Sequence, residues 1–428
     1  MPFSTDTRTL QPGDTYVAIR GEVHDGHRFI PQALEAGATG IVTEQAVDVP
    51  QGIEVTRVDD SIDWLVENAS AKVKHSGAKV VAITGSVGKT TTRAAIHAVV
   101  AESFPVVASE GNKNTPLGLA LMLLNRTIPS GAVLVLEMGA RSKGDIRELC
   151  AAFPPDVSVL TNVKGVHVET MGSIEGVARE KSEIIRALGP TGVACLNGDD
   201  ERVRTMTHLH GGLSLLFGTH PTCDLRPNLV TATLPILGDH AMHTALAAFA
   251  VGRALGMDDA AINNGLATMM PEKGRLVRLR GANESTLIDD TYNASPDAAI
   301  AAVRVLRQRE GSRRIACLGD MLELGETEVE QHANVLRDAL EHADVVFAVG
   351  PIMAKAADGL AVETVASSTD LAERIRAGEA GFPQAGDVVL VKGSQGTRME
   401  RVSEALLHPD LDPADVLPRQ STSWRQIA

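Results

Sequence analysis

The segment Lys79–Arg93 (KVVAITGSVGKTTTR) constrains the fold of this chain more than any other. A short β-branched apolar run leads into a turn that begins at Gly85, and Lys89 and Thr90 then open a helical pattern. A strand, a glycine turn and a helix in that order make an anion site, because backbone N–H groups and the helix N-terminus face one point. The lysine of such a site reaches the outer phosphates, and the threonine hydroxyl ligates Mg²⁺. The segment predicts a nucleoside triphosphate site, although Ile83 stands where the full phosphate-loop pattern has glycine.

The composition excludes several classes of partner. The chain has 428 residues, of which 44% are hydrophobic, 22% charged and only 3% aromatic, as in an ordinary globular protein. A net charge of −14 without a long basic run argues against nucleic-acid binding, as does the scarcity of aromatic rings. The cysteines form no C-x-x-C pair of a zinc or redox site: Cys150, Cys195, Cys223 and Cys317. With no signal-peptide core and no membrane-spanning apolar stretch, we expect a cytoplasmic protein.

Strand and helix patterns divide the chain into three α/β segments, which we interpret as domains. Residues 1–77 form a small N-terminal segment, and a break at His75-Ser-Gly77 precedes the phosphate-loop strand. Residues 78–271 alternate apolar strands with helices, which is typical of a parallel sheet covered on both faces. Residues 272–428 repeat this alternation and predict a Rossmann-like α/β domain. We expect the polar tail from residue 410 onward to be loosely held.

Polar residues follow several predicted strands, at the sheet edge where α/β proteins bind ligands. Glu137 closes a buried strand, where a carboxylate either holds Mg²⁺ or caps a loop. The acidic strand end at 289–293 (DDTYN) indicates a ligand edge, an ordinary turn before a helix, or both. His167 has a side chain that can ligate a metal, but a lone histidine is more often structural. Lys181 lies in a charged helical segment and reads as a solvent-exposed lysine.

A series of motifs extends along nearly the whole chain. In order they are STDTRTLQPGDTYVAIRG (4–21), DGHRFI (25–30), ITGSVGKTTT (83–92), GNKNTPLG (111–118), LEMGA (136–140), TNVKGVHVETMGS (161–173), AREKSEI (178–184), GRL (274–276), DDTYNASP (289–296), GDMLELG (319–325) and VKGS (391–394). The series resembles the Mur ligases, the ATP-dependent amide-forming enzymes of peptidoglycan precursor synthesis, whose phosphate loop has the same shortened glycine pattern. The GDMLELG and DDTYNASP versions resemble the branch that adds D-alanyl-D-alanine to UDP-N-acetylmuramoyl-tripeptide.

The resemblance implies roles for individual residues. Lys181 matches the family lysine that CO₂ converts to a carbamate, an anion that can orient Mg²⁺. The catalytic residues would then be Lys89, His167 and Lys181. The metal ligands would be Thr90, Glu137, His167 and Lys181. The ATP-binding residues would be Gly85, Ser86, Val87, Gly88, Lys89, Thr90, Thr91, Arg275, Asp290 and Asn293. The UDP-substrate-binding residues would be Ser4, Asp6, Thr7, Arg8, Asn112 and Asn114.

The resemblance also implies a reaction and a division of labour. ATP and Mg²⁺ would support amide synthesis through an acyl phosphate, giving ADP and phosphate. Residues 1–77 would bind the UDP substrate, residues 78–271 would bind ATP, and residues 272–428 would bind the amine acceptor and close over ATP. Closure before chemistry is expected because water destroys an acyl phosphate. The expected partners are UDP-N-acetylmuramoyl-tripeptide and D-alanyl-D-alanine, without nucleic acid or a membrane span, and we expect a monomer.

Two departures from the family pattern keep alternatives open. The family's first domain usually begins with a further helix and strand ahead of the segment matched here, so we expect this domain to be shortened. The family run Gly-x-His-Asn-x-x-Asn, in which an asparagine faces adenine, has Ala241 and Thr244 in place of both asparagines. These departures are consistent with a Mur-like paralogue that joins another carboxylate and amine. A catalytically inactive nucleotide-binding partner is the other alternative, and the intact motif residues argue against it: Lys89, Thr90, Glu137, His167 and Lys181.

Overall fold

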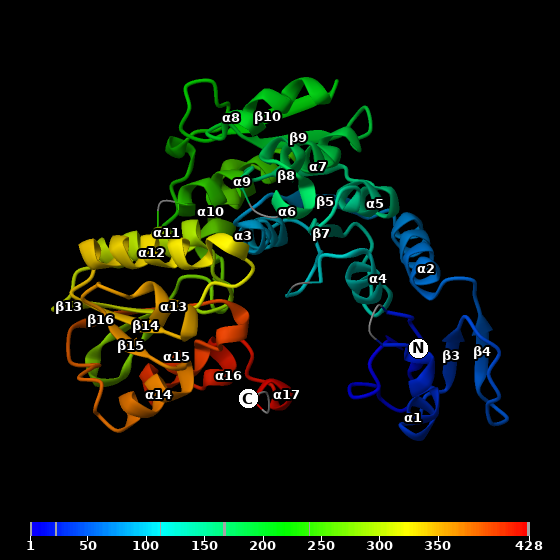
Figure 1. Cartoon of the computed structure of the whole chain (residues 1–428). Coiled ribbons are helices and arrows are strands. Elements are labelled where there is room, and N and C mark those ends of the chain that lie inside the picture. The colour runs from blue at the N-terminus through cyan, green and yellow to red at the C-terminus, as the bar shows by residue number, and fades with distance from the viewer. Residues whose placement is uncertain (1, 22–23, 112, 166–167, 239, 426–428) are drawn as a thin grey trace. The chain divides into compact units, whose positions relative to one another are not determined.

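The computed structural model describes residues 2–425 except 22–23, 112, 166–167 and 239 (Figure 1). The chain forms two compact units, which consist of residues 1–233 with 242–269 and of residues 234–241 with 270–428. Strands and helices alternate along both units and build three mainly parallel sheets. The α/β fold expected from the sequence is therefore confirmed.

The first unit begins with a small parallel sheet in the order β1-β2-β3-β4. Its strands are β1 Phe3–Ser4, β2 Thr15–Val17, β3 Gly40–Thr43 and β4 Glu54–Arg57. The helices of this segment are η1 Gly26–Phe29, α1 Ile30–Glu35 and α2 Ser61–Ser76. Asp60 caps α2, because its carboxylate accepts from the backbone N–H groups of Ile62 and Asp63. Gly77 ends α2 in the left-handed conformation that glycine adopts without strain.

The second sheet of this unit carries the phosphate loop and is parallel throughout, in the order β10-β9-β8-β5-β7-β6. Its strands are β5 Lys79–Thr84, β6 Val106–Ala108, β7 Val133–Glu137, β8 Val157–Leu160, β9 Val193–Asn197 and β10 Leu213–Phe217. Its helices are α3 Lys89–Ala101, α4 Pro116–Leu124, α5 Asp145–Ala152, α6 Val168–Met171, α7 Ile174–Arg186, α8 Glu201–Arg204, η2 Thr205–Leu209, η3 Pro227–Leu229, α9 His240–Ala254 and α10 Asp259–Thr268. The central strands are buried, as a sheet covered by helices requires.

Helix α2 joins the small sheet to the phosphate-loop sheet through one hydrophobic core. Leu65, Ala69 and Val73 of α2 lie in the same buried cluster as Val17 of β2 and Leu134 of β7. The Nζ of Lys72 donates to the backbone oxygens of Leu124 (2.9 Å) and Arg126 (2.8 Å), where α4 ends. Residues 1–77 and the phosphate-loop region therefore belong to one compact unit. The domain boundaries after residues 77 and 271 stay predictions.

The second unit contains a sheet in the order β11-β12-β16-β13-β14-β15, in which only the β11–β12 pair is antiparallel. Its strands are β11 Val277–Arg280, β12 Thr286–Asp290, β13 Arg313–Gly319, β14 Val345–Val349, β15 Glu363–Val365 and β16 Asp387–Lys392. Its helices are η4 Ala282–Glu284, α11 Pro296–Arg307, η5 Gly325–Thr327, α12 Glu328–His342, α13 Pro351–Ala356, α14 Ser368–Arg376, η6 Gln395–Thr397, α15 Glu400–Leu406, α16 Pro413–Val416 and α17 Thr422–Arg425. Side chains of α11, α12 and α13 form one core with the sheet, and those of α14 and α15 form another.

The C-terminal tail differs from the expectation that it is loosely held. Leu417 is 1% exposed and lies in the core that α14 and α15 share with the sheet. The side chain of Arg419 is 6% exposed and forms an ion pair with Glu400. The polar composition of the tail suggested weak attachment, but its few buried residues fix it to the second unit.

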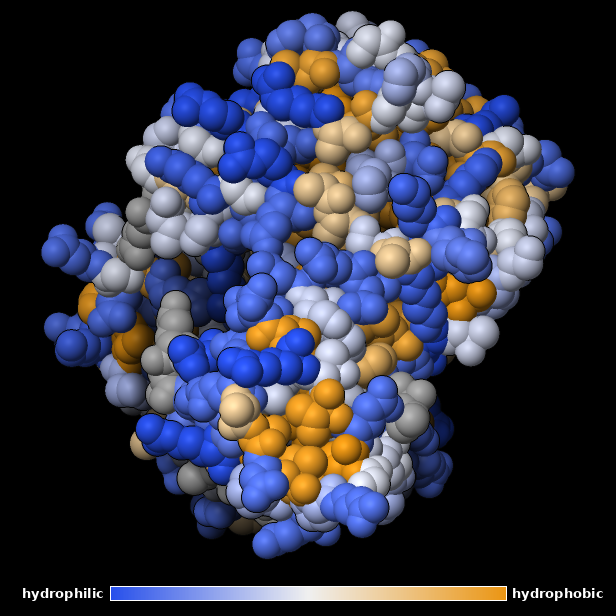
Figure 2. All heavy atoms as spheres, turned by 90° about the vertical axis from the view of Figure 1, so that its right-hand side faces the viewer, coloured by the Kyte–Doolittle hydropathy of each residue, from blue (hydrophilic) through white to orange (hydrophobic). Residues whose placement is uncertain are grey.

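The described surface is mostly polar. Figure 2 shows a face covered mainly by hydrophilic residues, with a compact hydrophobic area in its lower part and smaller ones elsewhere. Among the described residues, the large hydrophobic side chains that are exposed come from scattered elements: Phe29, Val55, Leu213, Met270, Leu322 and Val329. A search of the described helices finds none with the length and apolarity needed to cross a bilayer.

Candidate active site

The phosphate loop connects β5 to α3 in the way the sequence predicts. β5 ends at Thr84 and α3 begins at Lys89, so that the loop consists of Gly85, Ser86, Val87 and Gly88. Gly88 has φ 81°, in the left-handed region that favours glycine. A Cβ atom at Gly85 would lie 1.9 Å from Oγ1 of Thr161. The loop therefore requires glycine at both ends, and its second half leads directly into the helix N-terminus at Thr90 and Thr91.

The segment after β8 holds the phosphate loop in place. The side-chain amide of Asn162 accepts from the N–H of Val87 and donates to its carbonyl, both at 2.9 Å. The hydroxyl of Thr161 donates to the same carbonyl at 2.9 Å, and Oγ of Ser86 donates to the carbonyl of Lys164 at 3.1 Å. The site-residue prediction omitted these supporting residues. Their sequence signal was a polar pair at the carboxyl end of a strand beside β5.

Glu137 brings together two of the predicted site residues. Its carboxylate is 3% exposed and accepts from Oγ1 of Thr90 and from Nδ2 of Asn114, each at 3.0 Å. The ammonium group of Lys89 donates to the carbonyl of Gly85 at 2.9 Å and to that of Ser86 at 3.4 Å, so it lies over the loop. A hydroxyl next to a carboxylate is a donor set that Mg²⁺ prefers, so these residues fit a magnesium ion.

Lys181 is buried on α7. Lys181 is only 3% exposed, so the interpretation of it as a solvent-exposed lysine was wrong. Burial lowers the pKa of Lys181 to about 7, and the positive charge of Lys89 contributes in the same direction. The neighbouring Glu180 is also buried, and its carboxylate accepts from the N–H groups of Gly144 (2.7 Å) and Ile146 (2.8 Å). Glu180 thus fixes α7 against the beginning of α5.

Two predicted site residues lie outside the described residues, namely His167 and Asn112. Within the described ranges, no group of three or more His, Cys, Asp and Glu side chains could hold a metal ion. Of the predicted metal ligands, the structure brings Thr90 and Glu137 together as a hydroxyl–carboxylate pair.

The segment predicted to bind the UDP substrate forms a compact turn beside α4. Asp6 pairs with Arg8 at 2.6 Å, and Oγ of Ser4 donates to the carbonyl of Asp6 at 3.1 Å. The hydroxyl of Thr7 donates to the side chain of Gln32 at 3.1 Å. A recess of about 500 Å³ opens beside this turn, and its polar and charged lining includes Ser4, Thr5, Asp6, Lys113, Thr115 and Arg126.

Asn125 attaches the first strand to this recess. Its side-chain amide accepts from the N–H of Phe3 at 2.7 Å and donates to the carbonyl of Phe3 at 2.8 Å. The ring of Phe3 meets the ring of Trp64 edge-on, with centroids 5.7 Å apart. Asn125 also lines the recess, but no motif of the sequence pointed to it.

In the second unit, a group of charged residues surrounds the end of β12. Asp290 pairs with Lys392 at 2.7 Å, and both side chains are buried. Lys392 also donates to the carbonyl of Asn293 at 2.9 Å. The guanidinium group of Arg275 lies 4.1 Å from the ring centroid of Tyr292, and the described residues offer no hydrogen-bond partner to its buried Nε. The predicted residues Arg275, Asp290 and Asn293 are thus gathered at one sheet edge, as expected.

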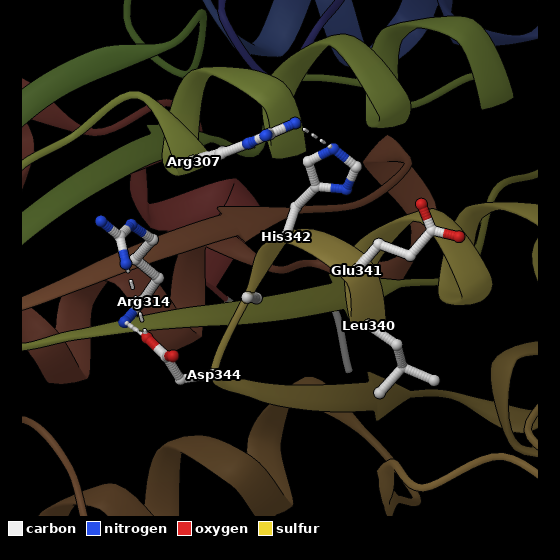
Figure 3. A pocket seen from close by; sticks show the side chains of 7 residues that line it. Arg307, Arg314, Leu340, Glu341, His342 and Asp344 are labelled. Carbon is white, nitrogen blue, oxygen red and sulfur yellow. Dashed lines mark hydrogen bonds and ion pairs between the residues drawn. The ribbon is translucent and has the colours of Figure 1, made fainter.

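A second recess lies at the opposite edge of this sheet (Figure 3). It is lined by Arg307, Arg314, Leu340, Glu341, His342, Ala343 and Asp344. Arg307 and the Nε2 atom of His342 are 3.2 Å apart, and the N–H of Arg314 donates to Asp344 at 2.7 Å. β13 and β14 begin here, whereas ligands of α/β sheets bind where strands end. We therefore do not assign this recess to the candidate active site.

Comparisons with known proteins agree with this geometry. Residues 3–90 match the catalytic domain of the Mur ligase family, residues 83–252 the Mur ligase middle domain, and residues 274–395 the Mur ligase glutamate ligase domain. A UDP-N-acetylmuramoyl-tripeptide–D-alanyl-D-alanine ligase of Bacillus subtilis (strain 168) is 33% identical over 95% of this chain and 93% of its own. The chain belongs to the Mur ligase family. The ligase of the same name from Escherichia coli (strain K12) is 32% identical over 94% of this Mur ligase and 93% of its own length.

Solved structures extend the likeness to the whole Mur ligase fold. A crystal structure of MurF from Acinetobacter baumannii superposes with a TM-score of 0.86 at 28% identity, covering 94% of this chain and 92% of that one. MurF from Thermotoga maritima in complex with ADP gives a TM-score of 0.80 at 29% identity, covering 94% and 96%. The expected family and three-domain α/β fold are therefore confirmed.

The run in which Ala241 and Thr244 replace the family asparagines lies at the beginning of α9. Ala241 is 8% exposed and Thr244 is 5% exposed, so both replacements are buried positions on α9. Between them, the Nε2 atom of His243 lies 2.8 Å from a carboxylate oxygen of Asp199. Asp199 is further held by backbone N–H groups of the next loop, which lower its pKa.

Proposed function

We propose that this Mur ligase joins D-alanyl-D-alanine to UDP-N-acetylmuramoyl-tripeptide and converts ATP to ADP and phosphate. The observation that carries the proposal is the whole-chain similarity to ligases of that name, together with the phosphate loop beside the hydrogen-bonded pair of Thr90 and the buried Glu137. The reaction, as ATP-dependent peptidoglycan precursor synthesis, belongs to the cytoplasm, where we place the protein as a monomer.

The first unit supplies the phosphate-binding groups. We assign ATP to the backbone N–H groups of Gly85, Ser86, Val87 and Gly88 and to the side chains of Lys89, Thr90 and Thr91. Thr90 and Glu137 would hold Mg²⁺, with His167 as a further proposed ligand. Bound Mg²⁺ neutralises charge on the phosphate oxygens. In the second unit, Arg275, Asp290 and Asn293 are proposed to contact ATP, and the buried Nε of Arg275, which has no hydrogen-bond partner among the described residues, is suited to an anionic group.

Lys181 is proposed to act as its carbamate. An amine must be neutral to attack CO₂, and a pKa of about 7 leaves a large neutral fraction at neutral pH. The amine nitrogen forms a bond to the carbon of CO₂ and releases one proton, so a buried cation becomes a buried anion. That anion would offset the nearby charges of Lys89 and Mg²⁺, which the ammonium form would oppose.

The chemistry proceeds in two displacements. An oxygen of the donor carboxylate attacks the γ-phosphorus in line, and the bond to the ADP oxygen breaks to give an acyl phosphate. Lys89 and the loop N–H groups stabilise the charge spread over the transferred phosphoryl oxygens. The amine of D-alanyl-D-alanine then attacks the acyl carbon, loses a proton, and the tetrahedral intermediate expels phosphate. The UDP portion of the donor is assigned to the segment and loop that carry Ser4, Asp6, Thr7, Arg8, Asn112 and Asn114.

Phosphate release tests the proposal directly. It should require both UDP-N-acetylmuramoyl-tripeptide and D-alanyl-D-alanine, in the presence of Mg²⁺ and bicarbonate. Lys89→Ala should abolish release, and Lys181→Ala should reduce it by roughly a hundredfold or more, the cost of losing a strong transition-state interaction. Lys79→Ala is the matched control, because Lys79 is exposed at the opposite end of β5. Nucleotide binding without release, or release that depends on another amine, would contradict the proposal.

A further inference from the structure

The C-terminal tail reaches the loop that follows β12. The tail carries the short helices α16 and α17, which are red in Figure 1, and Arg419 lies in the stretch that connects them. Its guanidinium side chain is 6% exposed, whereas Arg425, further along the tail, has a side chain that is 53% exposed. The tail therefore delivers one buried cation to the sheet edge that carries Asp290 and Asn293.

Arg419 holds the loop mainly through the loop's backbone carbonyls, and its guanidinium carbon also lies 5.8 Å from the centroid of the Tyr292 ring. Its Nη1 atom donates to the carbonyl of Tyr292 at 3.0 Å, and its Nη2 atom donates to the carbonyl of Thr291. The same Nη2 atom donates at 2.9 Å to Glu400, whose side chain is 2% exposed. The planar fork of an arginine can satisfy these acceptors together, which a lysine ammonium cannot do in the same geometry.

The carbonyls of four successive loop residues are thereby held by side chains. Arg419 donates to the carbonyls of Thr291 and Tyr292. Lys392 donates to the carbonyl of Asn293 at 2.9 Å, and Oγ of Ser394 donates to the carbonyl of Ala294 at 3.3 Å. Lys392 ends β16 and Ser394 follows it, so the contacts to Thr291 and Tyr292 are the ones that the C-terminal tail supplies. These contacts fix the course of the loop backbone between Asp290 and Ser295.

The loop held in this way contains the residues that would meet ATP. Asp290 and Asn293 flank the two carbonyls bound by Arg419, and the Tyr292 ring between them contacts the guanidinium of Arg275. Arg419 itself has φ 57°, in the left-handed region that non-glycine residues avoid. A strained backbone that is kept in place by buried contacts is common where a structure fixes a functional group.

We propose that Arg419 is a positioning residue for ATP: it clamps the backbone of Thr291 and Tyr292 so that Asp290, Asn293 and Arg275 are oriented for the nucleotide. The inference rests on the proposed function, since it concerns the ATP site of the same ligase. It makes the C-terminal tail part of the nucleotide-binding machinery rather than a passive end of the chain.

Three variants of the full-length protein separate positioning from general stability. Arg419→Ala removes the clamp, Arg419→Lys keeps the charge beside Glu400 but not the fork, and Arg425→Ala changes an exposed arginine of the same tail. Hydrogen exchange of residues 289–296 reports the loop itself, including the N–H of Tyr292, which donates to the carbonyl of Gly274 at 3.1 Å. The KM for ATP and the KM for the UDP substrate are measured in parallel.

We expect faster exchange of residues 289–296 in Arg419→Ala and a KM for ATP raised about tenfold or more, as for the loss of hydrogen bonds from a charged group. The KM for the UDP substrate should stay within about twofold of the wild-type value, because that substrate is bound elsewhere. Arg419→Lys should lie between wild type and Arg419→Ala, and Arg425→Ala should match wild type.

Two results would overturn the inference. One is unchanged exchange of residues 289–296 in Arg419→Ala, and the other is faster exchange with an unchanged KM for ATP and a fall in kcat alone, which indicates general loosening. If the wild-type protein releases no phosphate with the proposed substrates, the proposed function fails instead. The dissociation constant of a fluorescent ATP analogue for wild type and Arg419→Ala then decides the positioning role: an increase of about tenfold supports it, and equal values overturn it.

Discussion

Asp289 offers the sharpest test of the physical picture of the second unit. It precedes Asp290, the last residue of β12, and is 0% exposed. Its Oδ1 atom accepts from the hydroxyls of Ser403 (2.6 Å) and Thr291 (2.9 Å), while Oδ2 is buried without a partner among the described residues. Burial raises the pKa of Asp289 to about 7 from the ordinary 3.8, and the charge of Asp290 adds to the rise.

The direction of the stability effect follows from these two pKa values. Because the folded-state pKa lies above the unfolded-state value, the charged carboxylate destabilises the folded state, and this cost grows as the pH rises from about 4 to about 7. Between pH 5 and pH 8 the cost increases by roughly 3 kcal/mol, at 1.36 kcal/mol for each unit of pKa difference. Asp289→Asn removes the charge and keeps the acceptor that Ser403 and Thr291 use. The variant should therefore gain about 3 kcal/mol of stability relative to wild type between pH 5 and pH 8.

Urea unfolding at several pH values measures this difference. The chain has two tryptophans, Trp64 in the first unit and Trp424 in the second. In a Trp64→Phe background the fluorescence of Trp424 follows the unfolding of the second unit alone. Asp358→Asn serves as the matched control, because it makes the same chemical change at an exposed position.

A constant difference between Asp289→Asn and wild type from pH 5 to pH 8 would refute the reasoning. The reasoning would also be refuted if Asp289→Asn lost stability relative to wild type as the pH rises, because a raised pKa in the folded state predicts a gain. The same experiment with Asp358→Asn should give a difference from wild type that does not depend on pH.

Three further predictions concern the first unit. Gly85→Ala places a methyl group 1.9 Å from Oγ1 of Thr161, so calorimetry should show that the affinity for ATP falls by more than about tenfold. An affinity equal to that of the wild type would contradict the steric argument. Asn125→Ala removes both hydrogen bonds to Phe3, so the KM for the UDP substrate should rise about fivefold while the KM for ATP stays unchanged. Equal changes in the two KM values would count against a local role of Asn125. Because the pKa of Lys181 is lowered to about 7, the neutral fraction of its amine increases between pH 6 and pH 8, and bicarbonate-dependent phosphate release should increase with it. The residual phosphate release of Lys181→Ala should not change over this pH range. A parallel increase in that variant would refute the carbamate.

The sequence predicted those parts of the fold that local patterns determine. The strand before the phosphate loop and the buried strand that Glu137 closes were both predicted, because continuous apolar runs between polar breaks mark buried parallel strands. The short edge strand β4, Glu54–Arg57, was missed, since its side chains are mostly exposed and polar. The phosphate loop was predicted because all of its requirements lie within one continuous segment.

Features that depend on distant residues could not be predicted in this way. The burial of Lys181 results from the packing of α7, and its charged neighbours in the sequence pointed instead to solvent. Arg419 contacts residues more than a hundred positions earlier in the chain, at Thr291 and Tyr292. A polar tail with two prolines has no periodicity that would reveal a single buried side chain. The resemblance to a family identified Lys181 but gave no indication of Arg419.

The core shared through α2 affects how this enzyme can be engineered. Because Leu65, Ala69 and Val73 are buried together with side chains of the phosphate-loop sheet, a cut after residue 77 would expose an apolar helix face on one fragment and a matching hollow on the other. A chimaera that takes residues 1–77 from another ligase would inherit a mismatched interior, and each lost buried leucine or valine would cost about 2–5 kcal/mol. Residues 1–77 and the phosphate-loop region are therefore transplantable only as a single block.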